Sequence, residues 1–184
     1  MLCGIDEAGR GPLAGPVTAA AVVLPDDFDL SILNDSKKMT PLQRRKSAAV
    51  LIDKAVGFGI GWVWPSEIDE INIHHASLLA MKKAFMCLKQ DFVEVSVCRV
   101  LVDGKFYPPI SVKGEAVIKG DSKIPEIQAA SILAKEARDR WMIRYSWIES
   151  RYGYEKHKGY PTLFHRQKCR ELGPSCIQRR TFNF

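Results

Sequence analysis

The sequence lacks any hydrophobic run long enough to cross a membrane. A membrane-spanning helix needs roughly 18 or more consecutive apolar residues, and no segment of the 184 residues approaches that length. The opening residues also lack the charged stretch that precedes the apolar core of a secretory signal. We therefore expect a soluble, cytoplasmic protein with no membrane partner.

Cysteine is scarce and scattered, so neither a disulfide framework nor a zinc site is favoured. The five cysteines are an odd number, and no two of them form a CxxC pair. The nearest approach to zinc-ligand spacing combines His165 with Cys169 and Cys176, whereas zinc sites draw on closer cysteine and histidine pairs. We expect a reducing compartment and no catalytic cysteine.

Repeats and low-complexity segments are absent too, and the composition, 46% hydrophobic, suits one domain over residues 1–184. Apolar runs predict strands near residues 2–6, 16–24, 57–63, 97–102 and 115–118, and helical patterns cover about 41–55, 72–89 and 125–149. From about residue 145 the chain is predicted to be helical and rich in loops. This order predicts an α/β fold with a central mixed sheet flanked by helices. Four tryptophans are expected in the core or against helices: Trp62, Trp64, Trp141 and Trp147.

Carboxylates recur where the expected strands end. Asp6 and Glu7 follow the first apolar run, Asp103 ends a later one, and Asp121 lies between a short run and a helix start. Neighbouring side chains on a strand point to opposite faces, so Asp6 and Glu7 share one site only if the strand ends there. Each acid alone is typical of a turn or a helix start. Together, the four acids predict a site for a hard divalent cation, which prefers oxygen ligands.

A glycine-flanked arginine, Gly9-Arg10-Gly11, follows the first acidic pair. Glycine lets the backbone approach a bulky partner closely, and the planar guanidinium matches phosphate oxygens. The pattern favours an anion site beside the metal site. A plain polar turn after an edge strand is the open alternative, because short motifs often match by chance.

Basic charge is concentrated in the C-terminal part of the chain. Residues 1–112 carry 12 Lys and Arg against 13 Asp and Glu, whereas residues 113–184 carry 15 against 8. The net charge is therefore −1 in the first segment and +7 in the second. Such an asymmetry favours a polyanionic partner such as nucleic acid.

Several segments, in this order along the chain, resemble bacterial ribonuclease HII, the type 2 ribonuclease H family. The matching segments are residues 4–12 (GIDEAGRGP), 33–38 (LNDSKK), 68–73 (IDEINI), 102–104 (VDG), 119–123 (KGDSK), 129–135 (AASILAK), 157–162 (HKGYPT) and 179–182 (RRTF). The resemblance covers nearly the whole chain. It implies the ribonuclease H-like fold, whose central strands carry the acids at adjacent ends.

The resemblance also implies roles for individual residues. Catalysis and the binding of two Mg²⁺ or Mn²⁺ ions would fall to Asp6, Glu7, Asp103 and Asp121. The loop of Gly9, Arg10 and Gly11 would inspect the 2′-hydroxyl of a ribonucleotide and its phosphate. Tyr160 would stack on the sugar at the RNA–DNA junction, and the cluster containing Ser36 and Lys37 would contact phosphates. The role of Arg179 and Arg180 stays open between substrate contact and structural pairing.

By this resemblance the protein would be an endoribonuclease of DNA repair. It would cut on the 5′ side of a ribonucleotide embedded in duplex DNA, and would also cut the RNA strand of RNA/DNA hybrids, leaving 3′-hydroxyl and 5′-phosphate ends. We expect a monomer. Three alternatives are the sister enzyme ribonuclease HIII, which has Gly-Lys-Gly at the loop, another nuclease of the same fold, and a non-catalytic nucleic-acid-binding module.

Overall fold

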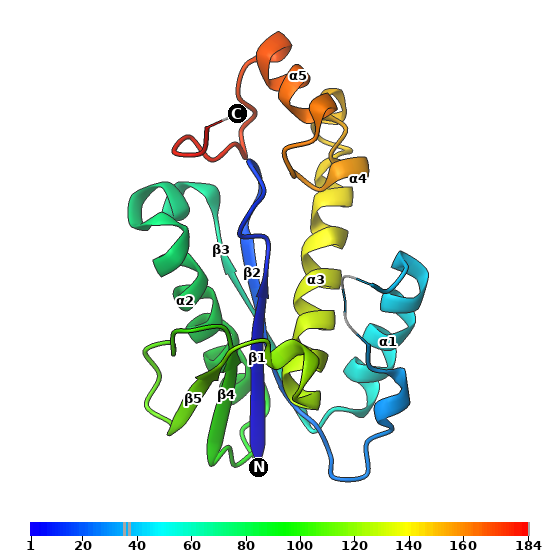
Figure 1. Ribbon diagram of the computed structural model, residues 1–184, viewed down its shortest axis with the longest axis vertical. Coiled ribbons are helices and arrows are strands. Elements are labelled where there is room, and N and C mark those ends of the chain that lie inside the picture. The colour runs from blue at the N-terminus through cyan, green and yellow to red at the C-terminus, as the bar shows by residue number, and fades with distance from the viewer. Residues whose placement is uncertain (35, 37, 184) are drawn as a thin grey trace.

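Five strands form one mixed sheet in the spatial order β3-β2-β1-β4-β5 (Figure 1). The computed structural model describes residues 1–34, 36 and 38–183. The strands are β1 (Leu2–Ala8), β2 (Val17–Val23), β3 (Gly57–Val63), β4 (Arg99–Asp103) and β5 (Gly114–Val117). β2 pairs antiparallel with β1 and β3, whereas β4 runs parallel to both β1 and β5. The mixed sheet expected from the sequence is confirmed.

Helices cover both faces of this sheet, with α2 on one face and α3 and α1 on the other (Figure 1). The α-helices are α1 (Pro41–Lys54), α2 (Pro65–Asp91), α3 (Pro125–Tyr145), α4 (Tyr154–His157) and α5 (Leu163–Leu172), and short 3₁₀ helices span Leu30–Ile32, Gly120–Ser122 and Ser150–Tyr152. The last two α-helices extend beyond the end of α3, which gives the C-terminal region its helical character. None of the helices in the described part is both long and apolar enough to cross a bilayer.

Alternation along β1 decides which side chains meet which helix. Cys3 and Ile5 are fully buried in the core on the α2 side, so Asp6 projects toward α3 on the opposite face. Gly4 lets α3 lie directly on β1, because a β-carbon at this position would sit 2.1 Å from the main-chain carbon of Glu126. The start of α3 is therefore held close to the acidic end of β1.

The observed elements differ from the predicted ones mainly at their ends. β1 continues to Ala8 instead of ending near residue 6, and α3 ends at Tyr145 instead of near residue 149. α2 begins at Pro65, and its course is broken at Asn72, where φ is 62° and the side-chain amide oxygen accepts the N–H groups of His74 and His75. The predicted start near residue 72 therefore marked only the second part of this helix.

One prediction about the tryptophans is wrong. Trp147 follows the end of α3 with 78% of its surface exposed, so it does not pack in the core or against a helix. The other three form a ring cluster, in which Trp64 lies 5.9 Å from Trp62 and 5.3 Å from Trp141 between ring centroids.

Candidate active site

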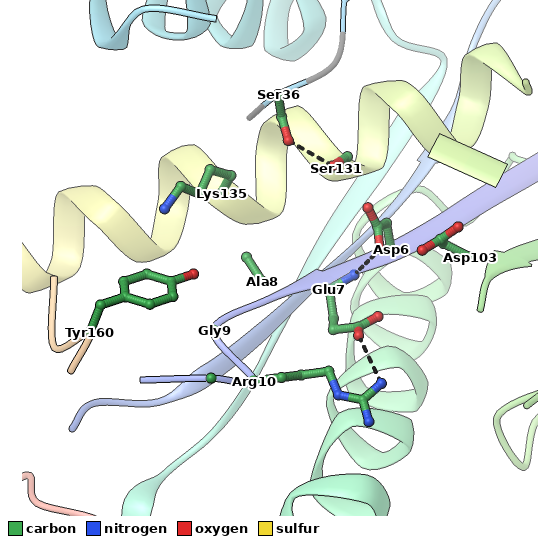
Figure 2. Close-up of a pocket in the computed structure, with 11 residues that line it drawn as sticks. Asp6, Glu7, Ala8, Gly9, Arg10, Ser36, Asp103, Ser131, Lys135 and Tyr160 are labelled. Atoms are coloured by element: carbon green, nitrogen blue, oxygen red, sulfur yellow. Dashed lines mark hydrogen bonds and ion pairs between the residues drawn. The ribbon is translucent and has the colours of Figure 1, made fainter. Parts of the chain in front are cut away.

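Three carboxylates converge at one end of the central strands. β1 and β4 run side by side with Ile5 opposite Val102, which places Asp6, two residues before the end of β1, next to Asp103, the last residue of β4. The 3₁₀ helix after β5 brings in Asp121. One carboxylate oxygen from each of the three residues lies within 4.8 Å of the others. Figure 2 shows Asp6 and Asp103 facing the same space between the sheet and α3.

Glu7 lies beside this group but does not join it. Because β1 continues through Glu7 to Ala8, paired with Ala19 and Thr18 of β2, the carboxylates of Asp6 and Glu7 point to opposite faces of the strand. Glu7 Oε1 instead contacts the Arg10 guanidinium, at 3.4 Å from Nη1 (Figure 2). The strand end that would let both acids share one centre is therefore absent, and a role for Glu7 as a metal ligand stays a prediction.

The electrostatics of the acidic group favour a bound cation. Burial raises the pKa of Asp6 well above its usual range, and repulsion by Glu7 and Asp103 raises it further. Burial also raises the pKa of Glu7, against the lowering effect of Arg10. Asp103 Oδ1 accepts the main-chain N–H groups of Gly120 and Asp121, at 2.7 and 3.4 Å, which fixes its orientation. Oxygen ligands and an excess of negative charge fit a hard divalent ion such as Mg²⁺ or Mn²⁺.

A cavity of about 460 Å³ opens beside these acids. It is lined by Asp6, Glu7, Ala8, Gly9, Arg10, Gly11, Ser36, Asp103, Ser131, Lys135 and Tyr160. The structure thus brings together most of the residues singled out in the sequence. Asp121 belongs to the carboxylate group, and Lys37 lies outside the described residues.

Two further residues, Ser131 and Lys135, line the cavity and were not expected there from the sequence. They lie four residues apart on α3, so they share one helix face. Ser131 Oγ is 2.9 Å from Ser36 Oγ, and Lys135 Nζ donates to Asp139 Oδ1 at 2.9 Å while lying 5.3 Å from the centroid of the Tyr160 ring. The four-residue spacing within the matched segment 129–135 was a signal that could have identified them.

The loop of Gly9 to Gly11 faces Tyr160 across the cavity (Figure 2). Gly9 has a φ of +95°, and a β-carbon there would lie 2.1 Å from Arg138 Nε. A β-carbon on Gly11 would instead be 3.9 Å from Tyr160 Cε1, an ordinary contact. The first glycine is therefore required by the fold, whereas the second borders open space next to the tyrosine.

Comparison with known families decides among the alternatives. A model of the family described as Ribonuclease HII matches residues 3–183. The chain belongs to the ribonuclease HII family. It is accordingly a ribonuclease H, an endonuclease that acts on nucleic acid, in a metal-dependent family.

Individual relatives agree with this assignment. Ribonuclease HII of Treponema denticola is 54% identical over 195 residues, which cover 99% of this chain and 98% of the relative. Ribonuclease HII of Dichelobacter nodosus is 44% identical over 182 residues, covering 99% and 94%. The crystal structure of ribonuclease H2 from Pyrococcus horikoshii OT3 matches with a TM-score of 0.76 at 26% identity, over 99% of this chain and 93% of that one. The ribonuclease H-like fold is thereby confirmed.

The two C-terminal arginines of the matched segment 179–182 differ in their surroundings. Arg179 is fully buried, and its guanidinium donates to the main-chain carbonyls of Gly9, Arg10 and Gly15. Arg180 is exposed, and its main-chain N–H donates to Asp69. Of the two roles left open by the sequence, Arg179 therefore has the structural one, and what it supports is the glycine-rich loop.

The main chain at Tyr160 is held by a buried histidine. His165 is fully buried, its Nδ1 lies 3.0 Å from the Tyr160 carbonyl oxygen, and its ring stacks on His157 at 4.3 Å between centroids. Burial, with a further contribution from His157, lowers the pKa of His165 to about 4 from 6.5. The neutral ring donates through Nδ1 to that carbonyl, so protonation at Nε2 would place a charge in the core.

We expect acid to destabilise the protein through this histidine. Because its pKa is lower in the folded state, the unfolded chain binds more protons below pH 6.5, and stability is lost as the pH falls from about 6.5 toward 4. The loss at pH 5 should be about 2 kcal/mol. Urea unfolding at pH 7.5 and 5.0 measures it, with His165→Asn as the comparison, since its amide can still donate to the carbonyl but does not titrate. An equal pH dependence in both proteins would contradict this assignment.

Proposed function

We propose that this enzyme hydrolyses the phosphodiester on the 5′ side of a ribonucleotide embedded in duplex DNA, and also cuts the RNA strand of RNA/DNA hybrids. The observation that carries the proposal is the placement of the Gly9–Gly11 loop opposite Tyr160 in the same cavity as Asp6 and Asp103. The loop and tyrosine that would recognise a sugar thus lie next to the acids that would bind cations. The products would carry 3′-hydroxyl and 5′-phosphate ends.

The acids would hold the catalytic ions. Asp6, Asp103 and Asp121 are the proposed ligands, and Glu7 would complete the set from the other side of β1 while orienting Arg10. Two bound Mg²⁺ or Mn²⁺ ions would activate a water and stabilise the leaving oxygen in phosphodiester hydrolysis. Asp103 is already oriented by the N–H groups of Gly120 and Asp121, so its carboxylate needs little rearrangement to bind.

The loop and the tyrosine would select the ribonucleotide. A 2′-hydroxyl both donates and accepts hydrogen bonds, and it is the group that distinguishes RNA from DNA at one position. Main-chain groups of Gly9 and Gly11 can approach it without side-chain obstruction. The Tyr160 ring would stack on the sugar, supported by the cations of Lys135 and Arg138 at 5.3 and 5.8 Å from its centroid.

Phosphates on either side would be held by basic and hydroxyl groups. Arg10 is exposed at the rim of the cavity, and its planar guanidinium can donate two parallel hydrogen bonds to phosphate oxygens. Ser36 lines the cavity, and Lys37 is proposed from the sequence alone. The surplus of +7 charges over residues 113–184 would attract the flanking duplex. A monomeric, cytoplasmic enzyme that removes ribonucleotides from DNA fits these features.

Cleavage of a labelled duplex that contains one ribonucleotide tests the proposal. We expect one cut, just 5′ of the ribonucleotide, that requires Mg²⁺ or Mn²⁺ and stops with EDTA, and no cut in an all-DNA duplex of the same sequence. End analysis should find a 3′-hydroxyl and a 5′-phosphate. Equal cutting of the all-DNA duplex would indicate a different nuclease, and cutting of long hybrids only would indicate the specificity of the sister enzyme.

A further inference from the structure

Two arginines are buried behind the cavity without carboxylate partners in their hydrogen bonds. Arg138 of α3 and Arg179 are both fully buried. Within the described chain, all six hydrogen bonds donated by the two guanidinium groups go to main-chain carbonyl oxygens. Burying a charge is costly unless it is well hydrogen-bonded. Two such charges side by side indicate that the carbonyls they hold need a fixed position.

Two of the carbonyls held by Arg179 belong to the glycine-rich loop that lines one wall of the cavity. Arg179 holds Gly9 at 2.6 Å and Arg10 at 3.0 Å, and it reaches Gly15 at 2.9 Å.

Arg138 continues the connection to the opposite wall. It holds Ala14 at 3.1 Å and Pro16 at 2.8 Å, next to the Gly15 carbonyl bound by Arg179, and Lys158 at 3.0 Å, two residues before Tyr160. The two arginines thus connect the glycine-rich loop through residues 14–16 to the tyrosine segment.

The direction of the loop amides follows from these bonds. In a trans peptide the C=O and the following N–H point to opposite sides, and the described chain contains no cis peptide. Since Arg179 draws the carbonyls of Gly9 and Arg10 inward, the N–H groups of Arg10 and Gly11 face the other way. Neither N–H has a hydrogen-bond acceptor in the described part of the chain.

We propose that Arg138 and Arg179 are positioning residues that fix the gap between the Gly9–Gly11 loop and Tyr160 and aim the Arg10 and Gly11 amides at the 2′-hydroxyl of the ribonucleotide. The proposal rests on the proposed function for the identity of the group recognised. It assigns specificity to two residues that do not touch the substrate.

The geometry of arginine, as well as its charge, is needed for this role. Burial lowers the pKa of Arg138 to about 10, and burial with repulsion by Arg138 lowers that of Arg179 to about 9. A lysine at either position would offer one compact ammonium in place of a planar fork, and it loses its proton more readily when buried. Its three N–H donors leave a single nitrogen, so they cannot reach together the carbonyls that an arginine contacts from its separate Nε, Nη1 and Nη2 atoms.

The substitution Arg179→Lys tests the proposal directly. The first measurement is made on the protein without substrate. In ¹⁵N relaxation measurements, we expect the order parameters of the Arg10 and Gly11 amides to fall from about 0.85 to below about 0.6, with β1 and α2 unchanged. Leu88→Ala, a fully buried change in α2 away from the cavity, is the control for a general loss of stability, and it should leave the loop rigid.

Kinetics then show whether the loop position matters for recognition. Arg179→Lys should lower kcat/KM on the single-ribonucleotide duplex by about 100-fold, mainly through kcat, while the Kd for an all-DNA duplex changes by less than about twofold. Leu88→Ala should stay within about threefold of the unmodified protein. If Arg179→Lys fails to fold, Thr181→Val, which removes one hydrogen bond from the same segment to Asp69, should show the same pattern with smaller changes.

Each contrary result overturns the proposal. A rigid loop with reduced activity would mean that Arg179 acts through its charge, and a mobile loop with full activity would mean that the loop position does not govern recognition. If the unmodified protein shows no preference for a ribonucleotide, the proposed function fails, and the relaxation data still decide whether Arg179 holds the loop.

Discussion

Asp6→Asn should abolish cleavage and at the same time make the metal-free protein more stable. Asp6 is 5% exposed and lies against Asp103, so its carboxylate is buried among like charges. Under the proposed function Asp6 is a metal ligand, and its loss should reduce kcat by at least about 10³-fold, because bound metal supplies several kcal/mol of transition-state stabilisation. Removal of the repelled charge should add about 1 kcal/mol of stability, or about 2–4 °C in Tm.

The pH dependence of this gain has a definite sign. Because the pKa of Asp6 is raised in the folded state, ionisation of the carboxyl weakens the fold as the pH rises above its usual value of 3.8. The advantage of Asp6→Asn should therefore be largest at neutral pH and vanish toward pH 4. It should also shrink when Mg²⁺ is added, since the ion stabilises the unmodified protein by binding the folded state.

Thermal unfolding with and without Mg²⁺, together with the single-ribonucleotide assay, measures both effects. Asp53→Asn is the matched control, because that carboxylate is exposed beside Lys54 on α1. It should change neither activity nor the response to Mg²⁺. If Asp6→Asn were active, or if it responded to Mg²⁺ as the unmodified protein does, Asp6 would not be a metal ligand.

Alanine at the two glycines that flank Arg10 should lower activity in both cases but lower stability in only one. Gly9→Ala places a β-carbon at a φ of +95° and 2.1 Å from Arg138 Nε. The backbone strain and the displaced guanidinium should together cost about 3 kcal/mol or more, which corresponds to roughly 10 °C in Tm for a protein of this size. Activity should fall because the loop moves.

Gly11→Ala should leave stability within about 0.5 kcal/mol, because its β-carbon meets only Tyr160, at 3.9 Å. The added methyl group fills space beside the ring that the sugar would occupy under the proposed function, so cleavage at a single ribonucleotide should still fall by about 100-fold. Thermal unfolding and the same cleavage assay separate the two variants. An active Gly11→Ala protein would mean that the sugar does not pass between this loop and Tyr160.

The sequence was sufficient to predict the elements whose patterns are local. β2 and β4 are predicted correctly because their runs are apolar enough to be buried on both faces, and α1 (Pro41–Lys54) matches the helical pattern expected over about 41–55. The first part of α2 was missed because Asn72 interrupts the helix with a positive φ, and the composition of the segment gives no sign of this break. The end of β1 was missed because its last two residues depend on pairing with β2.

The sequence was enough to predict which residue types form the site, but not which residues hold them in position. Asp6, Asp103 and Asp121 could be expected to meet, because strand ends of a sheet lie together. The orientation of Glu7 could not, since it depends on the length of β1. Five of the six carbonyls that Arg138 and Arg179 bind lie more than 120 residues away in the chain, and no short-range pattern carries such information.

α3 joins the two ends of the cavity through a single rigid element. Ser131 lies near the acids, and Arg138 lies beneath the loop and Tyr160, seven residues further along the helix. At 1.5 Å per residue this separation is about 10 Å. Under the proposed function, the rise of this helix sets the distance between the sugar that is recognised and the bond that is cut. The enzyme would then cut at the same position relative to the ribonucleotide in every duplex, whatever the sequence on either side.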